Sequence, residues 1–167
     1  MTDTIKDLTK DFWEALDKSR TVMLGTLGEG RVSARPMTAQ TDEDIKDGSI
    51  YFFASRGEGI GHEVLNGAHQ AQFTFQSKDH GIFASAIGPI VAVHDPAMVE
   101  KLWSVFAHLY YNDGKQDPNL VLLRFNPPAF DVWRSTSTGF LKAIAFKLMG
   151  KDAGAAMNNE DRATIIA

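Results

Sequence analysis

Cysteine is absent from this 167-residue sequence, and its absence removes several kinds of chemistry at once. Disulfides, thiolate catalysis, zinc sites with cysteine ligands and iron–sulfur clusters are all excluded. The chain also lacks the basic start and apolar run of a secretory leader. No apolar run approaches the roughly 20 residues that a membrane-spanning helix requires. We therefore expect a cytoplasmic protein with no membrane partner.

Positive charge is also scarce, with 17 lysines and arginines against 21 aspartates and glutamates. The formal net charge of −4 argues against a general nucleic-acid-binding protein, which needs a concentrated positive field to displace counterions from phosphates. The five histidines are scattered, and no two lie four residues apart. No metal site is expected, because metal ligands must converge. A Gly-x-Ser-x-Gly nucleophile turn is missing too, so a hydrolase has no support.

The remaining composition is typical of one globular domain. Hydrophobic residues make up 44% of the chain and charged residues 23%. The length also fits one domain rather than two. We place this domain at residues 1–150 and expect the small and polar residues 151–167 to form a mobile tail.

Apolar spacing predicts an amphipathic helix near residues 4–18 and further helices after Asp95-Pro96 and around residues 141–148. Between them, short segments bounded by turn signals predict strands. These segments are residues 21–27, 31–41, 49–55, 71–76, 82–93, 120–125 and 129–133. Gly88-Pro89 is expected to mark a bulge or bend. Hairpin-like connections without parallel crossovers favour an antiparallel barrel with helices, in the α+β class.

Several short motifs occur in a particular order along the chain. They are MLGTL at 23–27, ARPM at 34–37, YFFAS at 51–55, LW at 102–103, DP at 117–118 and VW at 132–133. Over roughly residues 5–135 the chain resembles the general stress protein 26-like branch of the pyridoxamine 5′-phosphate oxidase-related family. The resemblance implies an FMN-binding split barrel, that is, a six-stranded antiparallel split β-barrel with flanking helices. It also implies a homodimer with flavin sites at the subunit interface, binding FMN or, as the lesser alternative, FAD.

The resemblance implies that Arg35, Pro36 and Met37 line the flavin, with Arg35 near its polar edge or phosphate. An arginine suits this role because its planar and permanently charged fork donates several hydrogen bonds to oxyanions or carbonyls. The alternative is an arginine at a strand edge in a surface ion pair.

Ala54 and Ser55 are the last residues of the third predicted strand, and Ser55 and Arg56 lead into a glycine-rich loop at 57–61. Glycines let a backbone approach a phosphate closely, and the amides at a helix start favour an anion. This segment is therefore a candidate phosphate cradle, with a plain connection as the alternative. Many relatives carry a lysine a few residues past the strand, where this chain has Gly61 and His62. Arg56 or His62 is then the candidate substitute.

Two further residues are expected to reach the flavin by resemblance. Gln72 lies on the polar face of its strand, where related proteins place a side chain of the partner subunit near the cofactor. Trp133 ends the last predicted strand, and its ring could pack against the flavin. A solvent-facing glutamine and a structural tryptophan are the alternatives.

Pyridoxamine phosphate oxidation is a weak expectation for this chain. The oxidases carry additional basic residues and a histidine after the late tryptophan, whereas Trp133 is followed here by one arginine and no histidine through Phe140. A doubly charged substrate phosphate would be poorly compensated there. Three functions stay open: a flavin-dependent oxidoreductase of unknown substrate, a non-catalytic module that binds flavin or senses redox state, and a dimeric scaffold that has lost flavin. No catalytic acid or base can be named.

Overall fold

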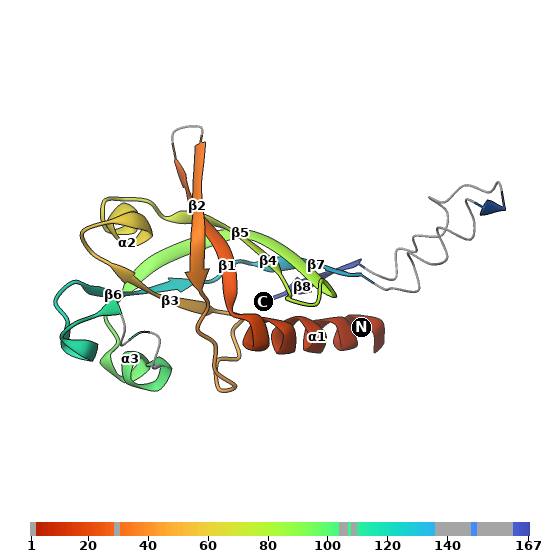
Figure 1. Cartoon of the computed structure of the whole chain (residues 1–167), viewed down its shortest axis with the longest axis horizontal. Coiled ribbons are helices and arrows are strands. Elements are labelled where there is room, and N and C mark those ends of the chain that lie inside the picture. Colours follow the sequence, from red (N-terminus) through yellow and green to blue (C-terminus); the bar gives the residue numbers. More distant parts are fainter. Residues whose placement is uncertain (1–2, 29–30, 104–106, 108–109, 136–147, 150–161) are drawn as a thin grey trace.

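The fold is described from a computed structural model of the whole chain (Figure 1). The structure describes residues 3–28, 31–103, 107, 110–135, 148–149 and 162–167. No helix in these ranges is long and apolar enough to cross a membrane.

Most helices and strands follow one another in the order that the sequence predicts. The helical elements are α1 (Asp3–Ser19), α2 (Gly59–Leu65), α3 (Pro96–Leu102) and the 3₁₀ turn η1 (Gly114–Gln116). The strands are β1 (Thr21–Gly28), β2 (Arg31–Thr38), β3 (Ile50–Ser55), β4 (Gln70–Gln76), β5 (Ile82–Val93), β6 (Leu120–Phe125), β7 (Ala129–Arg134) and β8 (Arg162–Ile166). Most of the helix expected around residues 141–148 lies outside the described residues.

Six of the strands form a curled antiparallel sheet in the order β2-β1-β4-β5-β6-β3. Among the described residues, the segment just after β2 meets β3 at a single antiparallel bridge, where the Gln40 and Tyr51 backbones exchange hydrogen bonds of 2.8 and 3.0 Å. Apart from this bridge, β2 and β3 are not paired with each other, so the barrel is split between them. The predicted α+β split barrel is confirmed.

Two strands lie outside this six-stranded path, so the sheet has eight strands rather than six. β7 pairs with β5, and β8 pairs with β7 on its other side. Residues 151–161 of the expected tail lie outside the described residues, but its last residues form β8. Ile165 of β8 is buried in the core, which explains why this end of the chain pairs with the sheet.

The expected irregularity at Gly88-Pro89 lies where β5 changes neighbours. β6 and β7 run along the same edge of β5, and the chain between them breaks at Pro127. From Ser85 to Ile90 the register advances by five residues on β5 and by six on the opposing chain, as in a bulge. A Cβ atom on Gly88 would lie 2.3 Å from the Pro127 Cα atom. Glycine is needed here because the two backbones approach too closely for a side chain.

Helix α1 closes one end of the barrel. Leu8, Phe12 and Leu16 lie on one helical face and are at most 1% exposed. The Phe12 ring contacts Phe130 of β7 at a centroid distance of 5.0 Å and Phe75 of β4 at 6.2 Å. The predicted amphipathic helix is therefore present, and its apolar face packs against strands that lie far along the chain.

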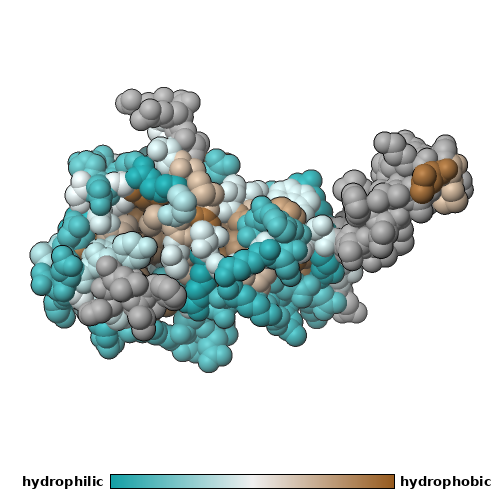
Figure 2. All heavy atoms as spheres, in the orientation of Figure 1, coloured by the Kyte–Doolittle hydropathy of each residue, from teal (hydrophilic) through white to brown (hydrophobic). Residues whose placement is uncertain are grey.

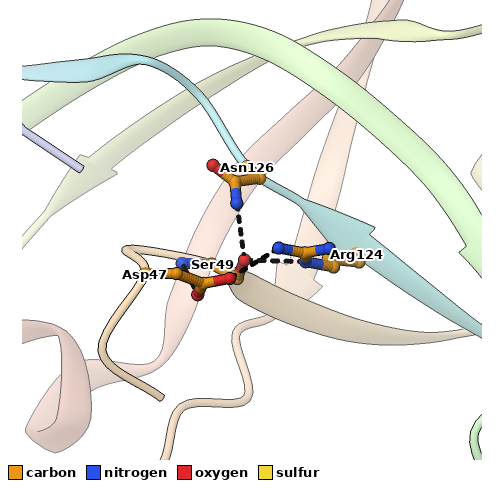
Figure 3. Close-up of polar contacts among 4 residues, drawn as sticks. All are labelled: Asp47, Ser49, Arg124 and Asn126. Carbon is orange, nitrogen blue, oxygen red and sulfur yellow. Dashed lines mark hydrogen bonds and ion pairs between the residues drawn. The ribbon is translucent and has the colours of Figure 1, made fainter.

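A polar network fastens the start of β3 to β6 (Figure 3). Arg124 donates to the Ser49 hydroxyl at 2.8 Å and to the Asp47 carboxylate at 2.5 Å. The Asn126 amide donates to the same hydroxyl at 2.9 Å. Ser49 is 1% exposed, so these bonds satisfy a buried hydroxyl. The network holds β3 in place next to the barrel split.

Candidate functional site

A cavity of about 420 Å³ occupies the split between β2 and β3. Its lining comes from both edge strands, from the start of α2 and from three residues near position 110. The lining residues are Arg35, Pro36, Met37, Thr38, Gln40, Phe53, Ala54, Ser55, Glu58, Gly59, Ile60, Ala107, Tyr110 and Tyr111. The cavity thus lies where the two edge strands no longer pair.

Strand alternation decides which β2 side chains face the barrel interior. Arg35 lies opposite Leu24 in the β1–β2 ladder, and Met37 lies opposite Val22. Leu24 and Val22 are core residues, and directly opposed residues of an antiparallel pair share one face of the sheet. Arg35 and Met37 therefore lie on the interior face, whereas Pro36 lies on the outer face.

Arg35 is held by a carboxylate of α2 and by a hydroxyl of its own strand. Its Nη2 atom donates to the Glu63 carboxylate of α2 at 2.9 Å and to the Ser33 hydroxyl at 3.2 Å. The second oxygen of Glu63 accepts a hydrogen bond from the Thr26 hydroxyl of β1. Gly59 has φ +61°, and a Cβ atom there would lie 2.7 Å from the Arg35 Nη1 atom. A side chain at position 59 would therefore displace the guanidinium.

Tyr111 is the most strongly perturbed titratable group of the lining. Burial raises the pKa of its phenol to about 12, although a hydrogen bond with the Ser55 side chain acts in the opposite direction. The Trp103 ring lies between Tyr111, at a centroid distance of 6.3 Å, and Phe53 of β3, at 5.4 Å. These contacts attach the segment after α3 to β3. The phenol is therefore a neutral hydrogen-bonding group throughout the physiological pH range.

The cavity brings together five of the nine residues singled out from the sequence. They are Arg35, Pro36, Met37, Ala54 and Ser55. They come from two segments that the sequence separates and the barrel places side by side. Arg35 forms an ion pair with Glu63 and also lines the cavity, so the ion pair does not exclude contact with a ligand there.

Arg56 and His62 do not line this cavity. Arg56 is exposed and borders a separate cleft of about 260 Å³ that also contains His94 and Lys115. The Arg56 and Gly57 amides donate to the Asn119 backbone and side-chain oxygens, at 2.8 and 3.2 Å. His62 is exposed on α2. The expected phosphate cradle is thus partly occupied by the chain's own hydrogen bonds.

Gln72 and Trp133 lie on the outside of the sheet. Trp133 borders a second cavity of about 420 Å³ with Met23, Pro36 and Phe83, and the Arg162 guanidinium lies 5.1 Å from its ring centroid. Gln72 is half-buried on the same side of the sheet. Pro36 lines both cavities, so the two lie next to each other. Neither Gln72 nor Trp133 lines the first cavity of the same chain.

Several lining residues were not identified from the sequence. Phe53 could have been found, because alternation along the aromatic third strand places it on the same side as Ser55. Tyr111 could not, because it is more than 50 residues from its hydrogen-bond partner. Glu63, behind the lining, gave no signal either: an acidic residue on a short helix is usually solvated.

Comparisons with known proteins agree with this architecture. The family model described as pyridoxamine 5′-phosphate oxidase like matches residues 7–157. The general stress FMN/FAD binding protein of Xanthomonas citri is 41% identical, with a TM-score of 0.70 over 79% of this chain and 92% of that one. A general stress family protein of Xanthomonas campestris pv. campestris is 39% identical, with a TM-score of 0.71 over 82% and 92% of the two chains.

A protein of Jannaschia sp. CCS1 assigned as general stress protein 26 is 29% identical, with a TM-score of 0.75 over 97% of this chain and 99% of that chain. No match was found among curated proteins. The family match covers most of the sequence, and the similar structures share the split barrel. The chain therefore belongs to the pyridoxamine 5′-phosphate oxidase-like family, with general stress proteins among its structural neighbours.

Proposed function

We propose that this protein is a flavin-binding general stress protein that holds the flavin ring in the cavity between β2 and β3. The observation that carries this proposal is the cavity itself, in which Arg35 to Met37 meet Ala54 and Ser55 in the barrel split. A general stress protein that is 41% identical is described as binding FMN or FAD, which supports the same ligand class here. FMN is the proposed ligand, and FAD is the alternative.

The lining residues fit a flavin ring. Met37, Phe53 and Ile60 are apolar and suited to the faces of a flat aromatic system. Arg35 donates hydrogen bonds, and the Tyr111 phenol can donate or accept them, as the carbonyls and nitrogens at the polar edge of the ring require. When bound, the isoalloxazine would supply redox chemistry, while the protein would position it and control access.

The function also includes a proposed homodimer that packs through the outer sheet face. We define this face by Met23, Pro36, Phe83, Ile87 and Trp133. Met23 is 40% and Ile87 55% exposed, which is unusual for large apolar side chains on a sheet. Figure 2 shows apolar residues gathered over β1 and β2, above the hydrophilic outer surface of α1. A second copy docked here would bring its side chains next to the flavin cavity through Pro36.

The first experiment is a visible absorption spectrum of the purified protein, followed by fluorescence titration with FMN and FAD. Yellow protein, or saturable quenching of FMN at micromolar concentration, supports the proposal. A colourless protein that binds neither flavin would reject it and leave a dimeric scaffold as the better reading. Turnover of NAD(P)H by the flavin-loaded protein would then separate an oxidoreductase from a non-catalytic flavin-binding module.

A pair of arginine variants tests the location of the site. Arg35→Ala should weaken FMN binding by about 1–3 kcal/mol, because it removes a charge-assisted donor from the cavity. Arg56→Ala changes the same kind of residue at an exposed position outside the lining, and its effect should stay within about 0.5 kcal/mol. Fluorescence titration of both variants measures this. A larger loss in Arg56→Ala than in Arg35→Ala would move the flavin towards the second cleft.

A further inference from the structure

We propose that the cavity selects the flavin ring and discriminates only weakly in favour of the phosphate, because Glu63 offsets the charge of Arg35. This inference rests on the proposed function and adds a residue that sets ligand specificity. It predicts that riboflavin and FMN bind with similar affinity, although FMN carries a dianionic phosphate.

The charge of the lining is the first observation. Among the described residues that line the cavity, Arg35 is the one cation and Glu58 is an anion, so together they contribute no net charge. Two further cations, Arg56 and Lys115, border the separate cleft instead. A phosphate dianion is bound tightly where cations surround it, and this lining does not provide such an arrangement.

The Arg35–Glu63 pair is the second observation. The carboxylate lies 2.9 Å from the guanidinium, and Thr26 holds its other oxygen. Both side chains are about one-third exposed, so water screens the pair in part but does not separate it. Both hydrogen bonds that Arg35 donates within the described residues leave from Nη2. Its remaining N–H groups can therefore donate to a flavin carbonyl, while Glu63 cancels most of the field that a phosphate would feel.

The backbone of the glycine-rich loop is the third observation. Two amides of this segment, those of Arg56 and Gly57, already donate to Asn119 and are therefore not available to a phosphate. The apolar and hydrogen-bonding parts of the lining, by contrast, match the ring. The chain thus presents a ring site with weak compensation for a phosphate.

Glu63→Gln separates the charge of Glu63 from its role in holding Arg35. Glutamine keeps an oxygen that can accept from Arg35, and the Thr26 hydroxyl can reverse to accept from the new amide. The positive charge of Arg35 is then no longer cancelled. Glu14→Gln is the matched control, because Glu14 forms a 3.7 Å ion pair with Lys10 on α1 and does not line the cavity.

The experiment is fluorescence titration of the full chain with FMN and with riboflavin, at low and high salt. In wild-type protein the affinities for FMN and riboflavin should differ by less than about tenfold, because Glu63 offsets the charge of Arg35 and water screens what remains. Glu63→Gln should bind FMN about three- to tenfold more tightly and riboflavin within about twofold of wild type. Added salt should reduce this gain, because it screens the uncompensated charge. Glu14→Gln should change neither affinity.

Three outcomes would contradict the inference or its basis. If wild-type protein binds FMN more than about 100-fold more tightly than riboflavin, charges outside this lining hold the phosphate and the inference is wrong. If Glu63→Gln leaves FMN affinity unchanged or weakens it, Glu63 does not limit phosphate binding. If wild-type protein binds neither flavin, the proposed function fails rather than this addition to it. The ratio of FMN affinity to riboflavin affinity and its salt dependence are measured on wild-type protein. The inference can therefore be tested even if Glu63→Gln does not fold.

Discussion

At the scale of single residues, the cavity depends on side chains whose behaviour is set by partners from distant parts of the chain. Arg35 pairs with Glu63, 28 residues away, and its guanidinium lies across Gly59. Tyr111 is bonded to Ser55 and shielded by the aromatic residues around it. Each contact turns an ordinary surface residue type into a positioned group with a defined hydrogen-bonding role.

Tyr111 leads to a prediction about alkaline stability. Its pKa is about 12 in the folded protein and about 10 in the unfolded chain, so folding favours the protonated phenol. This contribution is fully present below pH 10 and is lost as the pH rises towards 12. Tyr111→Phe cannot ionise, so its free energy of unfolding should fall less steeply over this range than that of wild type. Urea unfolding at several pH values measures the slopes.

The same variant has a smaller cost at neutral pH. Losing the hydrogen bond to Ser55 should destabilise Tyr111→Phe by about 1 kcal/mol at pH 7. Tyr110→Phe is the matched control, because Tyr110 is 82% exposed and its hydroxyl is free to bond to water. Equal alkaline slopes for Tyr111→Phe and wild type would show that the phenol is not shielded.

At the scale of elements, the geometry of the site depends on where strands stop pairing. β2 and β3 meet at one bridge and then separate, and the Asp47–Ser49–Arg124 network keeps the start of β3 beside β6. Further along, β6 and β7 share the edge of β5 because Gly88 lets the chain at Pro127 pass close by. The opening is therefore a consequence of strand connections as much as of the residues that line it.

Gly88→Ala should destabilise the protein by about 1–3 kcal/mol, since a new methyl group would overlap the Pro127 backbone. Gly28→Ala is the matched control, because a Cβ atom there has nothing within 4 Å. Its effect should stay within about 0.5 kcal/mol. Urea unfolding at neutral pH compares the two variants. Similar stabilities for both would mean that the strands separate easily at the bulge.

At the scale of the whole molecule, α1 packs against the interior of the barrel. The described residues of this chain leave the outer face of the sheet uncovered. Trp133, which the resemblance implies to lie near the flavin, lies on this face beside Phe83 and does not line the first cavity of its own chain. A dimer through this face would explain both the uncovered apolar face and the position of Trp133. The partner's outer face would then border the flavin. The resemblance predicts such a dimer, and it stays a prediction.

Ile87→Asp tests the assembly. A carboxylate in the middle of an apolar interface would be buried without a partner, so the variant should shift from dimer to monomer at micromolar concentration. Leu65→Asp, at an exposed apolar position on α2, should leave the assembly state of wild type. Sedimentation velocity distinguishes the species. Monomeric wild-type protein, or a dimer unaffected by Ile87→Asp, would contradict the proposed interface.

The sequence by itself determined the class of fold and the positions of most elements. Period-two and helical spacing depend on neighbouring residues, so α1 and strands β1 to β7 could be predicted close to their observed limits. The need for glycine at position 88 and the helix start at Asp95-Pro96 were also predictable, because glycine, proline and aspartate act through local backbone geometry. β8 was not, since a short segment after a polar stretch pairs with β7 through contacts that local composition does not reveal.

Only the tertiary structure decided which candidate residues meet. Arg35 and Ser55 come together because β2 and β3 are the two edges of one curled sheet, whereas Arg56, one residue beyond Ser55, lies outside the lining of the same cavity. The roles of Glu63 and Tyr111 depend on packing across the barrel, which no pattern of neighbouring residues encodes. The sequence determines which side chains are available at each position. The closure of the sheet determines which of them come close enough to form a site.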